Sequence, residues 1–176
     1  MAEFEEIAER IAGADALLIG AGNGLSITEG LHLFADNRAF EELFGDLKYR
    51  YGISCILDGM LARWPSEEEY WGFWSRLIRH YCIGYSLSAC MRDLRAISGG
   101  KDCFVLTTNG ECHFEMTGFA PENIYEVEGT WLAMQCSRGC HGALYPCGEL
   151  AGKMAALEKD GCVPSELLPV CPHCGA

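Results

Sequence analysis

The chain has 176 residues, 49% hydrophobic and 22% charged, which is enough for one folded domain with a small insert. Its net charge of −12 argues against nucleic acid or an anionic membrane surface as a partner, so an acidic cofactor must be held by backbone amides and local dipoles. The first ten residues are acidic and no apolar run approaches ~20 residues, so we expect a cytoplasmic protein without an export signal or membrane span.

The predicted elements are strands and helices, with several helices inserted between the first and second strands. Phe4, Ile7, Ala8 and Ile11 have helical spacing, and the short apolar run 14–20 ends in glycine, as a buried parallel strand does. Helices are expected at residues 3–12, 36–44, 67–81 and 88–98, and buried strands at residues 14–20, 102–107 and 123–128. Ser66, followed by three acids, is a good N-cap for the third helix. This order predicts an α/β fold with a parallel sheet and right-handed crossovers.

A glycine-rich turn, Gly20-Ala21-Gly22-Asn23-Gly24, lies between the first predicted strand and a helix. Glycines at such a turn let the backbone approach a pyrophosphate, and the first amides of the helix stabilise its charge. The motif alone is weak, because many strand–helix turns with glycines are purely structural. An acidic ribose ligand about 20 residues on would fall at Glu41 or Glu42, and neither follows a convincing strand, so an ordinary dehydrogenase half is not expected.

The C-terminal region carries two short-spaced cysteine pairs, Cys136-x3-Cys140 and Cys171-x2-Cys174. With no export signal, the eleven cysteines favour metal ligation over disulfides. Two such pairs supply the four soft ligands that Zn²⁺ prefers in a tetrahedron, so we predict a structural zinc site. Rival ligands are His141, Cys147 and His173. The metal would stabilise a segment with too little core to fold alone.

Taken together, these motifs resemble the sirtuin family over about residues 12–176. Gly20-Ala21-Gly22 through Ser26 and Gly30 is similar to the family's GAG-x-S-x-x-x-G turn, and Thr107-Thr108-Asn109 to its T-Q-N segment. Residues 126–130 are similar to its E-L-H-G-S stretch, and the cysteine pairs to its zinc ribbon. The resemblance implies a partial Rossmann-like parallel sheet with a helical insert and a small zinc-ribbon module.

The expected division is residues 1–35 and 99–130 for the NAD-binding part, 36–98 for the helical insert and 131–176 for the zinc-binding module. In the sirtuin fold, three further strands follow the zinc ribbon, and they are not found here. We therefore expect a fragment, or a chain that another polypeptide completes. Without those strands, residues 16–19 form an open apolar edge, which is an association hazard, so self-association is one expected outcome.

Within the family, three features resemble the class M sirtuins, microbial enzymes associated with macrodomain proteins. Thr108 replaces glutamine, residues 70–76 are similar to a W-x-x-W-S-R stretch, and Glu128 replaces the usual catalytic histidine. The subgroup implies a protein ADP-ribosyltransferase that uses NAD and acts on an acceptor protein, such as a lipoylated carrier, with a macrodomain partner. The alternatives are a lysine deacylase and a non-catalytic remnant that binds zinc and ADP-ribose. A nucleic-acid-binding zinc ribbon is a poor alternative, since the region from Trp131 has only three basic residues.

The resemblance also implies roles for individual residues. Asn109 matches the asparagine that binds ribose and water, and Glu128 stands at the position of the catalytic base, where a carboxylate could also stabilise a developing cation. Glu111 replaces the aspartate that holds the nicotinamide amide. The predicted catalytic residues are Asn109 and Glu128, and the predicted cofactor contacts are Gly20, Ala21, Gly22, Asn23, Ser26, Thr108, Asn109 and Glu111.

Several other residues have a simpler interpretation. His32 and His113 are expected to be partly buried structural histidines, and Tyr70, Trp71 and Trp74 to form helical core rather than an acceptor groove. Cys112 lies near the candidate site, but nothing in the sequence marks its thiol as activated. Asn109 as a strand cap and Glu128 as a surface residue remain open alternatives.

Overall fold

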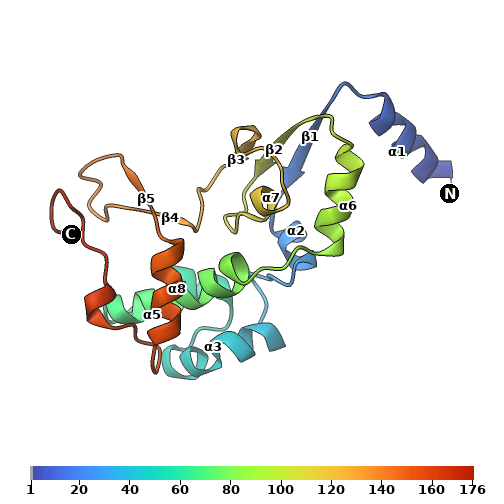
Figure 1. Ribbon diagram of the computed structural model, residues 1–176. Helices are drawn as coiled ribbons and strands as arrows, with labels where there is room; N and C mark the ends of the chain where they lie inside the picture. The colour runs from blue at the N-terminus through green and yellow to red at the C-terminus, as the bar shows by residue number, and fades with distance from the viewer. Residues whose placement is uncertain (1) are drawn as a thin grey trace. The chain divides into compact units, whose positions relative to one another are not determined.

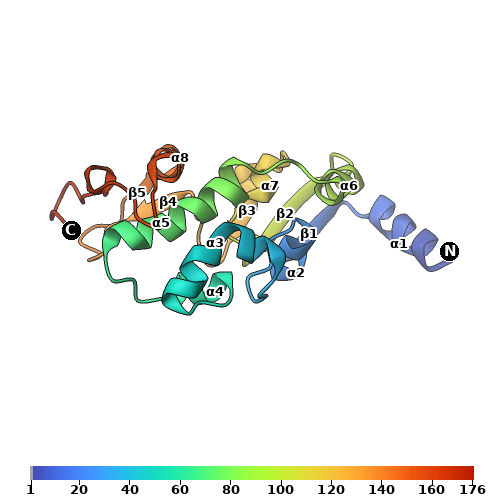
Figure 2. The same ribbon diagram turned by 90° about the horizontal axis from the view of Figure 1, so that it is seen from below.

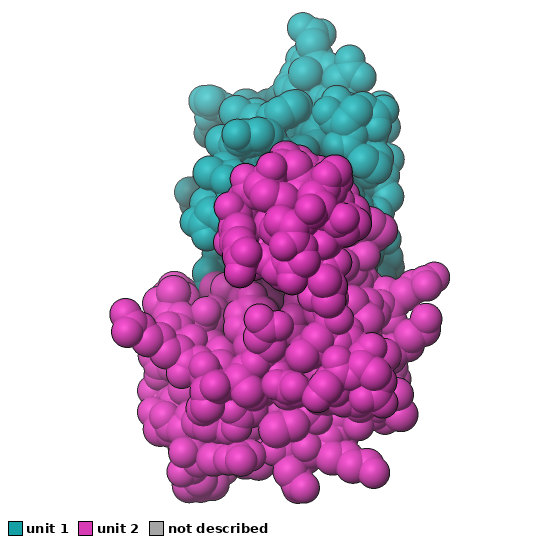
Figure 3. Space-filling model, turned by 90° about the vertical axis from the view of Figure 1, so that its left-hand side faces the viewer, with its two compact units in different colours: residues 1–29, 86–130 teal, residues 30–85, 131–176 magenta. Residues whose placement is uncertain are grey.

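The computed structural model describes residues 2–176, which form two compact units. The sheet unit consists of the chain up to Glu29 together with Ser86–Thr130, and the cysteine unit consists of Gly30–Tyr85 and Trp131–Ala176 (Figure 3). The chain therefore leaves the first unit after the first strand and helix, and returns to it before the second strand.

The sheet unit is built on three parallel strands in the order β1-β2-β3 (Figure 1). The strands are β1 (Ala16–Ala21), β2 (Asp102–Thr107) and β3 (Ile124–Glu126), and the helices of this unit are α1 (Ala2–Gly13), α2 (Asn23–Thr28), α6 (Ala89–Ser98) and α7 (His113–Met116). β2 is the central strand and pairs along the whole of β1, from Ala16 opposite Asp102 to Ala21 opposite Thr107. The carboxyl ends of all three strands consequently meet at one edge of the sheet.

One face of this sheet is covered and the other is exposed. Met91 of α6 and Phe114 of α7 pack against Val105 of β2 and are at most 4% exposed. On the opposite face the alternate residues are apolar but open to solvent, and they include Leu18, Phe104, Leu106 and Tyr125. Strands that are apolar on both faces are typical of parallel sheets covered on both sides. Here only one side is covered by the residues that the structure describes.

The cysteine unit is mainly helical. It contains α3 (Arg38–Tyr51), α4 (Ile56–Leu61), α5 (Glu67–Ile78), which continues as a π-helical turn over Arg79–Ile83, and α8 (Gly148–Leu157), with the short antiparallel pair β4 (Ala133–Gln135) and β5 (Leu144–Pro146). α3 and α4 lie against α5 (Figure 2), and the rings of Phe44 and Phe73 approach to 4.7 Å between centroids. α8, which comes much later in the sequence, also packs along α5.

The predicted elements are present, with differences in length. Asn37 caps α3, which runs on to Tyr51 rather than ending at residue 44, and it stops where Gly52 adopts a left-handed conformation. Ser66 caps α5 as expected, through a hydrogen bond from the Glu69 amide to its Oγ. β3 is shorter than predicted, and α4 and α8 were not predicted. The α/β class with a parallel sheet is confirmed, while the three-part division remains a prediction. No helix of residues 2–176 is long and apolar enough to cross a membrane.

Candidate functional site

The glycine turn and the asparagine loop are joined at the carboxyl edge of the sheet. The Thr108 amide donates to the carbonyl of Ala21 at 3.2 Å, which extends the β1–β2 pairing by one residue. The Asn109 side-chain amide then donates from Nδ2 to the carbonyl of Gly22 at 3.1 Å. Thr107 Oγ1 accepts from the Asn109 backbone amide at 3.0 Å and holds this loop in place. Asn109 therefore faces the glycine turn, on the side of the sheet edge where α2 begins.

Space remains beside two glycines of this turn. A β-carbon added at Gly20 or at Gly24 would meet no other atom within 4 Å, so nothing in the described chain occupies that side of the backbone. At Gly22 the added carbon would lie 3.3 Å from Thr108 Oγ1, which is a tight contact. α2 has only six residues, so any anion held here depends on individual amides rather than on a long helix dipole. These features fit a dinucleotide that approaches the bare backbone.

A buried hydrogen bond links α2 to the loop after β2. Ser26 Oγ donates to Glu111 Oε1 at 2.8 Å, and both side chains are almost fully buried. His113 is also buried, and its Nδ1 lies 3.7 Å from the same carboxyl oxygen. Glu111 is therefore fixed beneath the asparagine loop by a partner 85 residues away in the sequence.

Below this loop lies a small cavity whose lining includes Asn109, Glu111, Cys112, Glu115 and Glu126. Burial, reinforced by the neighbouring carboxyl of Glu115, raises the pKa of Glu126 to about 7. Burial also raises the pKa of the Cys112 thiol to about 12, so this thiol is not activated as a nucleophile. The cavity is acidic and lies directly beside the predicted ribose-binding residue.

Glu128 does not share this environment. It lies in an exposed turn after β3, closed by a hydrogen bond from the Gly129 amide to the Glu126 carbonyl at 3.1 Å. Among residues 2–176, no hydrogen bond or ion pair joins Glu128 to Asn109. The structure thus brings Gly22, Thr108 and Asn109 together and places Asn23 at the start of α2, while Glu128 stands apart.

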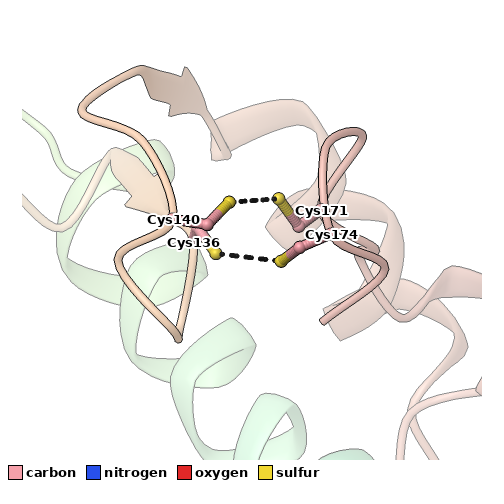
Figure 4. Close-up of side chains that lie close together, drawn as sticks. All are labelled: Cys136, Cys140, Cys171 and Cys174. Carbon is pink, nitrogen blue, oxygen red and sulfur yellow. Dashed lines mark hydrogen bonds between the residues drawn. The ribbon is translucent and has the colours of Figure 1, made fainter.

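The four predicted metal-binding cysteines converge in the cysteine unit (Figure 4). Cys136 and Cys140 lie in the loop between β4 and β5, and Cys171 and Cys174 lie in a turn near the end of the chain. The Sγ atoms of Cys136 and Cys174 are 3.6 Å apart, as are those of Cys140 and Cys171, and all four lie within 4.8 Å of one another. Four sulfurs around a tetrahedral Zn²⁺ at ~2.3 Å would be separated by roughly 3.8 Å. The spacing therefore fits zinc.

The charges of the cluster also fit a dication. A backbone hydrogen bond near Cys140 lowers the pKa of Cys136 to about 6, which favours its thiolate. Burial, together with the adjacent sulfurs, raises the pKa of Cys140. Such crowded thiols cannot all ionise without a cation, and a bound Zn²⁺ stabilises each as thiolate. His141 lies beside the cluster, with Nδ1 3.0 Å from Cys140 Sγ, and its Nε2 lies 2.8 Å from the Tyr145 hydroxyl.

The other residues singled out in the sequence have mainly structural surroundings. Cys147 is buried against Ile78 and Ala151, and its thiol contacts the Trp131 carbonyl. His32 accepts a local hydrogen bond from the Phe34 amide. Trp74 packs edge-on against Trp131 at 6.1 Å between ring centroids, whereas Tyr70 is 40% exposed.

Sequence reasoning missed the cluster of Cys112, Glu115 and Glu126, whose ligand atoms lie within 4.8 Å of one another. No spacing motif joins these residues, because they come from the start of α7, from α7 itself and from the end of β3. The signal in the sequence was indirect. Cys112 and Glu115 follow one predicted parallel strand and Glu126 lies near the end of another, and the carboxyl ends of parallel strands share one edge.

No family model matches the chain, but comparisons with individual proteins are informative. A Sir2 homologue in complex with NAD superposes with a TM-score of 0.62 at 15% identity, over 98% of this chain and 58% of the other. A mutant Sir2 homologue in complex with ADP-ribose gives 0.62 at 16% identity, over 98% of this chain and 59% of the other. This chain has the Sir2, or sirtuin, fold. The sirtuin-like fold implied by the glycine turn, the Thr-Thr-Asn segment and the cysteine pairs is thereby confirmed.

Two relatives carry names related to ADP-ribose. The chain is 30% identical over 174 residues to a protein ADP-ribosyltransferase of Staphylococcus aureus, covering 99% of this chain and 55% of that protein. It is 28% identical over 176 residues to a probable bifunctional ADP-ribose hydrolase/ADP-ribosyltransferase of Fusarium oxysporum f. sp. cubense, covering 96% of this chain and 29% of that protein. The sirtuin-fold chain therefore spans about half of the first relative and less than a third of the second.

Proposed function

We propose that this sirtuin-fold chain binds NAD and forms part of a protein ADP-ribosyltransferase of the class M type. The observation that carries the proposal is the hydrogen bond from the Asn109 side chain to the Gly22 carbonyl. It sets the predicted ribose ligand against the turn predicted to receive the pyrophosphate. The name of the Staphylococcus aureus relative supports transfer of ADP-ribose to a protein.

Bound NAD would supply the ADP-ribose group, with nicotinamide as the leaving group. Gly22 and the first amides of α2 would hold the diphosphate. Asn109 would orient the ribose through the side-chain oxygen and N–H that its hydrogen bond to Gly22 does not use. Glu111, fixed by Ser26, would face the nicotinamide side of the pocket. A carboxylate near the ribose can stabilise positive charge that develops at the anomeric carbon.

Glu128 lies outside the surroundings of Asn109. Glu128 is exposed, whereas Glu126, two residues earlier, is half-buried and lines the cavity beside Asn109. We therefore propose that Glu128 acts only if the acceptor or the cofactor covers its turn. A Glu128→Ala variant tests this directly, because removal of a surface glutamate would leave transfer unchanged.

The acceptor is proposed to be a protein, with a lipoylated carrier as the first candidate. The Fusarium oxysporum relative is named for both ADP-ribose hydrolysis and ADP-ribosyl transfer. That pairing supports a partner able to remove ADP-ribose, such as a macrodomain protein.

The test is incubation of the chain with labelled NAD, a lipoylated carrier protein and an acetyl-lysine peptide. Label transfer should fall about 100-fold in Asn109→Ala, the scale expected when one positioned polar group is lost from an active site. Asn123→Ala, in the 3₁₀ turn before β3, is the matched control and should retain wild-type transfer.

The other outcomes of this incubation distinguish the alternative functions. Deacetylation without label transfer would replace the transferase by a lysine deacylase. NAD binding without either reaction would leave an ADP-ribose-binding module. Failure to bind NAD at millimolar concentration, with the fold intact, would overturn the proposal.

A further inference from the structure

A second group of potential metal ligands lies in the sheet unit, separate from the four cysteines. The Cys112 thiol and one carboxyl oxygen each of Glu115 and Glu126 lie within 4.8 Å of one another. Cys112 is 6% exposed, and all three residues line the same cavity. Three potential ligands from separate parts of the backbone thus converge on one small cavity.

The cluster is strongly acidic, and no described Lys or Arg side chain lines its cavity. Among residues 2–176, no Lys or Arg side chain forms an ion pair with Glu115 or Glu126, and Glu111 adds a third carboxyl group to the same cavity. Like charges held this close repel one another, and a dication relieves that repulsion directly. Among the described residues that line this cavity, His113 is the one group that can carry a positive charge, and its Nδ1 lies 3.7 Å from a carboxyl oxygen of Glu111.

The diphosphate of NAD does not explain this cluster. It is anionic and would be repelled by several carboxylates beside Asn109, so their natural occupant is a positively charged group. The cationic nicotinamide ring of NAD is one such group, and a divalent metal ion is the other. Metal binding can be measured without nucleotide, so its failure is distinguishable from failure of the proposed function.

The ligand types select the class of cation. Mg²⁺ and Ca²⁺ prefer all-oxygen sites, whereas a thiolate with two carboxylates suits a borderline metal such as Zn²⁺ or Co²⁺. Three protein ligands leave one tetrahedral position for water, in contrast to the closed set of four cysteines. Thr130, whose Oγ1 is 2.8 Å from Cys112 Sγ, lies close enough to orient the thiolate or that water.

We propose that Cys112, Glu115 and Glu126 form a second divalent-metal site, which takes Zn²⁺ or Co²⁺ with an open fourth position. On binding, the Cys112 thiol releases its proton to solvent and its sulfur becomes a metal ligand. The site would place a metal ion directly under the asparagine loop and would offset most of the negative charge of its ligands.

The test counts metals on the full chain. Native mass spectrometry after addition of Zn²⁺ should find two ions per chain in the wild type and one in Cys112→Ser, the remaining ion being that of the four cysteines. Chain that already holds one zinc should then bind one further Co²⁺, with a near-ultraviolet thiolate-to-cobalt band that Cys112→Ser abolishes. Glu115→Gln and Glu126→Gln should each weaken cobalt binding at least 10-fold.

The controls are Cys90→Ser, an exposed thiol in α6, and Glu122→Gln, an exposed acid before β3, and both should behave as wild type. Retention of the first zinc in every variant shows that the cysteine unit is still folded, and an unchanged far-ultraviolet circular dichroism spectrum is the check on the sheet unit. A single metal in the wild type would overturn the proposal. So would a second metal that survives both Cys112→Ser and Glu126→Gln, since it would then bind elsewhere.

Discussion

Ser26 shows how one hydroxyl fixes the candidate site. Its Oγ donates to a buried carboxyl oxygen of Glu111, joining α2 to the loop after β2. Ser26→Ala should destabilise the chain by about 1–3 kcal/mol, because the carboxyl group keeps its burial but loses a donor. Urea unfolding of Ser26→Ala, Glu111→Gln and the double variant measures the coupling, expected at about 0.5–3 kcal/mol. Additive effects would show that the two side chains do not interact.

Gly72 lies where α5 approaches the backbone of the Gly161 turn too closely for a side chain. A β-carbon at this position in α5 would lie 1.9 Å from the backbone carbonyl oxygen of Gly161, so either the helix or the Gly161 turn must move. Gly72→Ala should therefore cost about 1–3 kcal/mol despite the better helix propensity of alanine.

Gly152 in α8 is the matched control for Gly72. An added β-carbon there meets Ile83 Cδ1 at 3.5 Å, which is ordinary contact. When both variants are compared by thermal unfolding, Gly152→Ala should stabilise the chain by up to about 1 kcal/mol, because alanine is the better helix former. Equal effects of the two substitutions would contradict the close approach at Gly72.

At the scale of elements, Arg76 joins three helices of the cysteine unit. From α5 its guanidinium makes paired hydrogen bonds to Asp46 of α3 and to Glu158 at the end of α8. Glu158 is 11% exposed, so Arg76→Met would leave a nearly buried carboxylate without its partner. The expected loss is about 3–5 kcal/mol of unfolding free energy. The double variant Arg76→Met/Glu158→Gln should recover part of it, and no recovery would show that packing rather than charge is lost.

The same network gives a pH dependence. A hydrogen bond from Arg76 lowers the pKa of Asp46 below its ordinary value of 3.8. A carboxyl group whose pKa is depressed by folding contributes stability above its unfolded pKa, and this contribution disappears as the pH falls through the folded pKa. The wild type should therefore lose stability below about pH 4 more steeply than Asp46→Asn does. Parallel acid unfolding curves for the two proteins would contradict this assignment.

For the whole molecule, local signals account for what the sequence could predict. The strand β2, the Ser66 cap and the cysteine pairs each depend on neighbouring residues, and each was found from the sequence. α8 was missed because its glycines weaken the helical pattern, and its stability comes from packing against α5.

Long-range convergence was harder to predict. Asn109 and Gly22 are 87 residues apart, and only the family resemblance placed them together. Cys112, Glu115 and Glu126 form no motif at all, and their proximity follows from the parallel pairing of β2 with β3. Glu128 was singled out by its position in the resemblance, yet burial and charge in the structure draw attention to Glu126 instead.

Removal of zinc should affect the two units differently. In the cysteine unit, the β4–β5 hairpin and the turn at Cys171–Cys174 have few buried apolar residues, and the four cysteines are the main link between them. A chelator should therefore increase amide hydrogen exchange strongly over residues 131–147 and 163–176, because metal binding and folding of such segments are coupled. Strand β2 of the sheet unit, whose Val105 is fully buried, should keep its protection. Cys174→Ser should reproduce the effect without chelator, whereas Cys90→Ser should not. Unchanged exchange around Cys136 after complete zinc removal would mean that the hairpin is held by its own packing, and the metal would then lose its structural role.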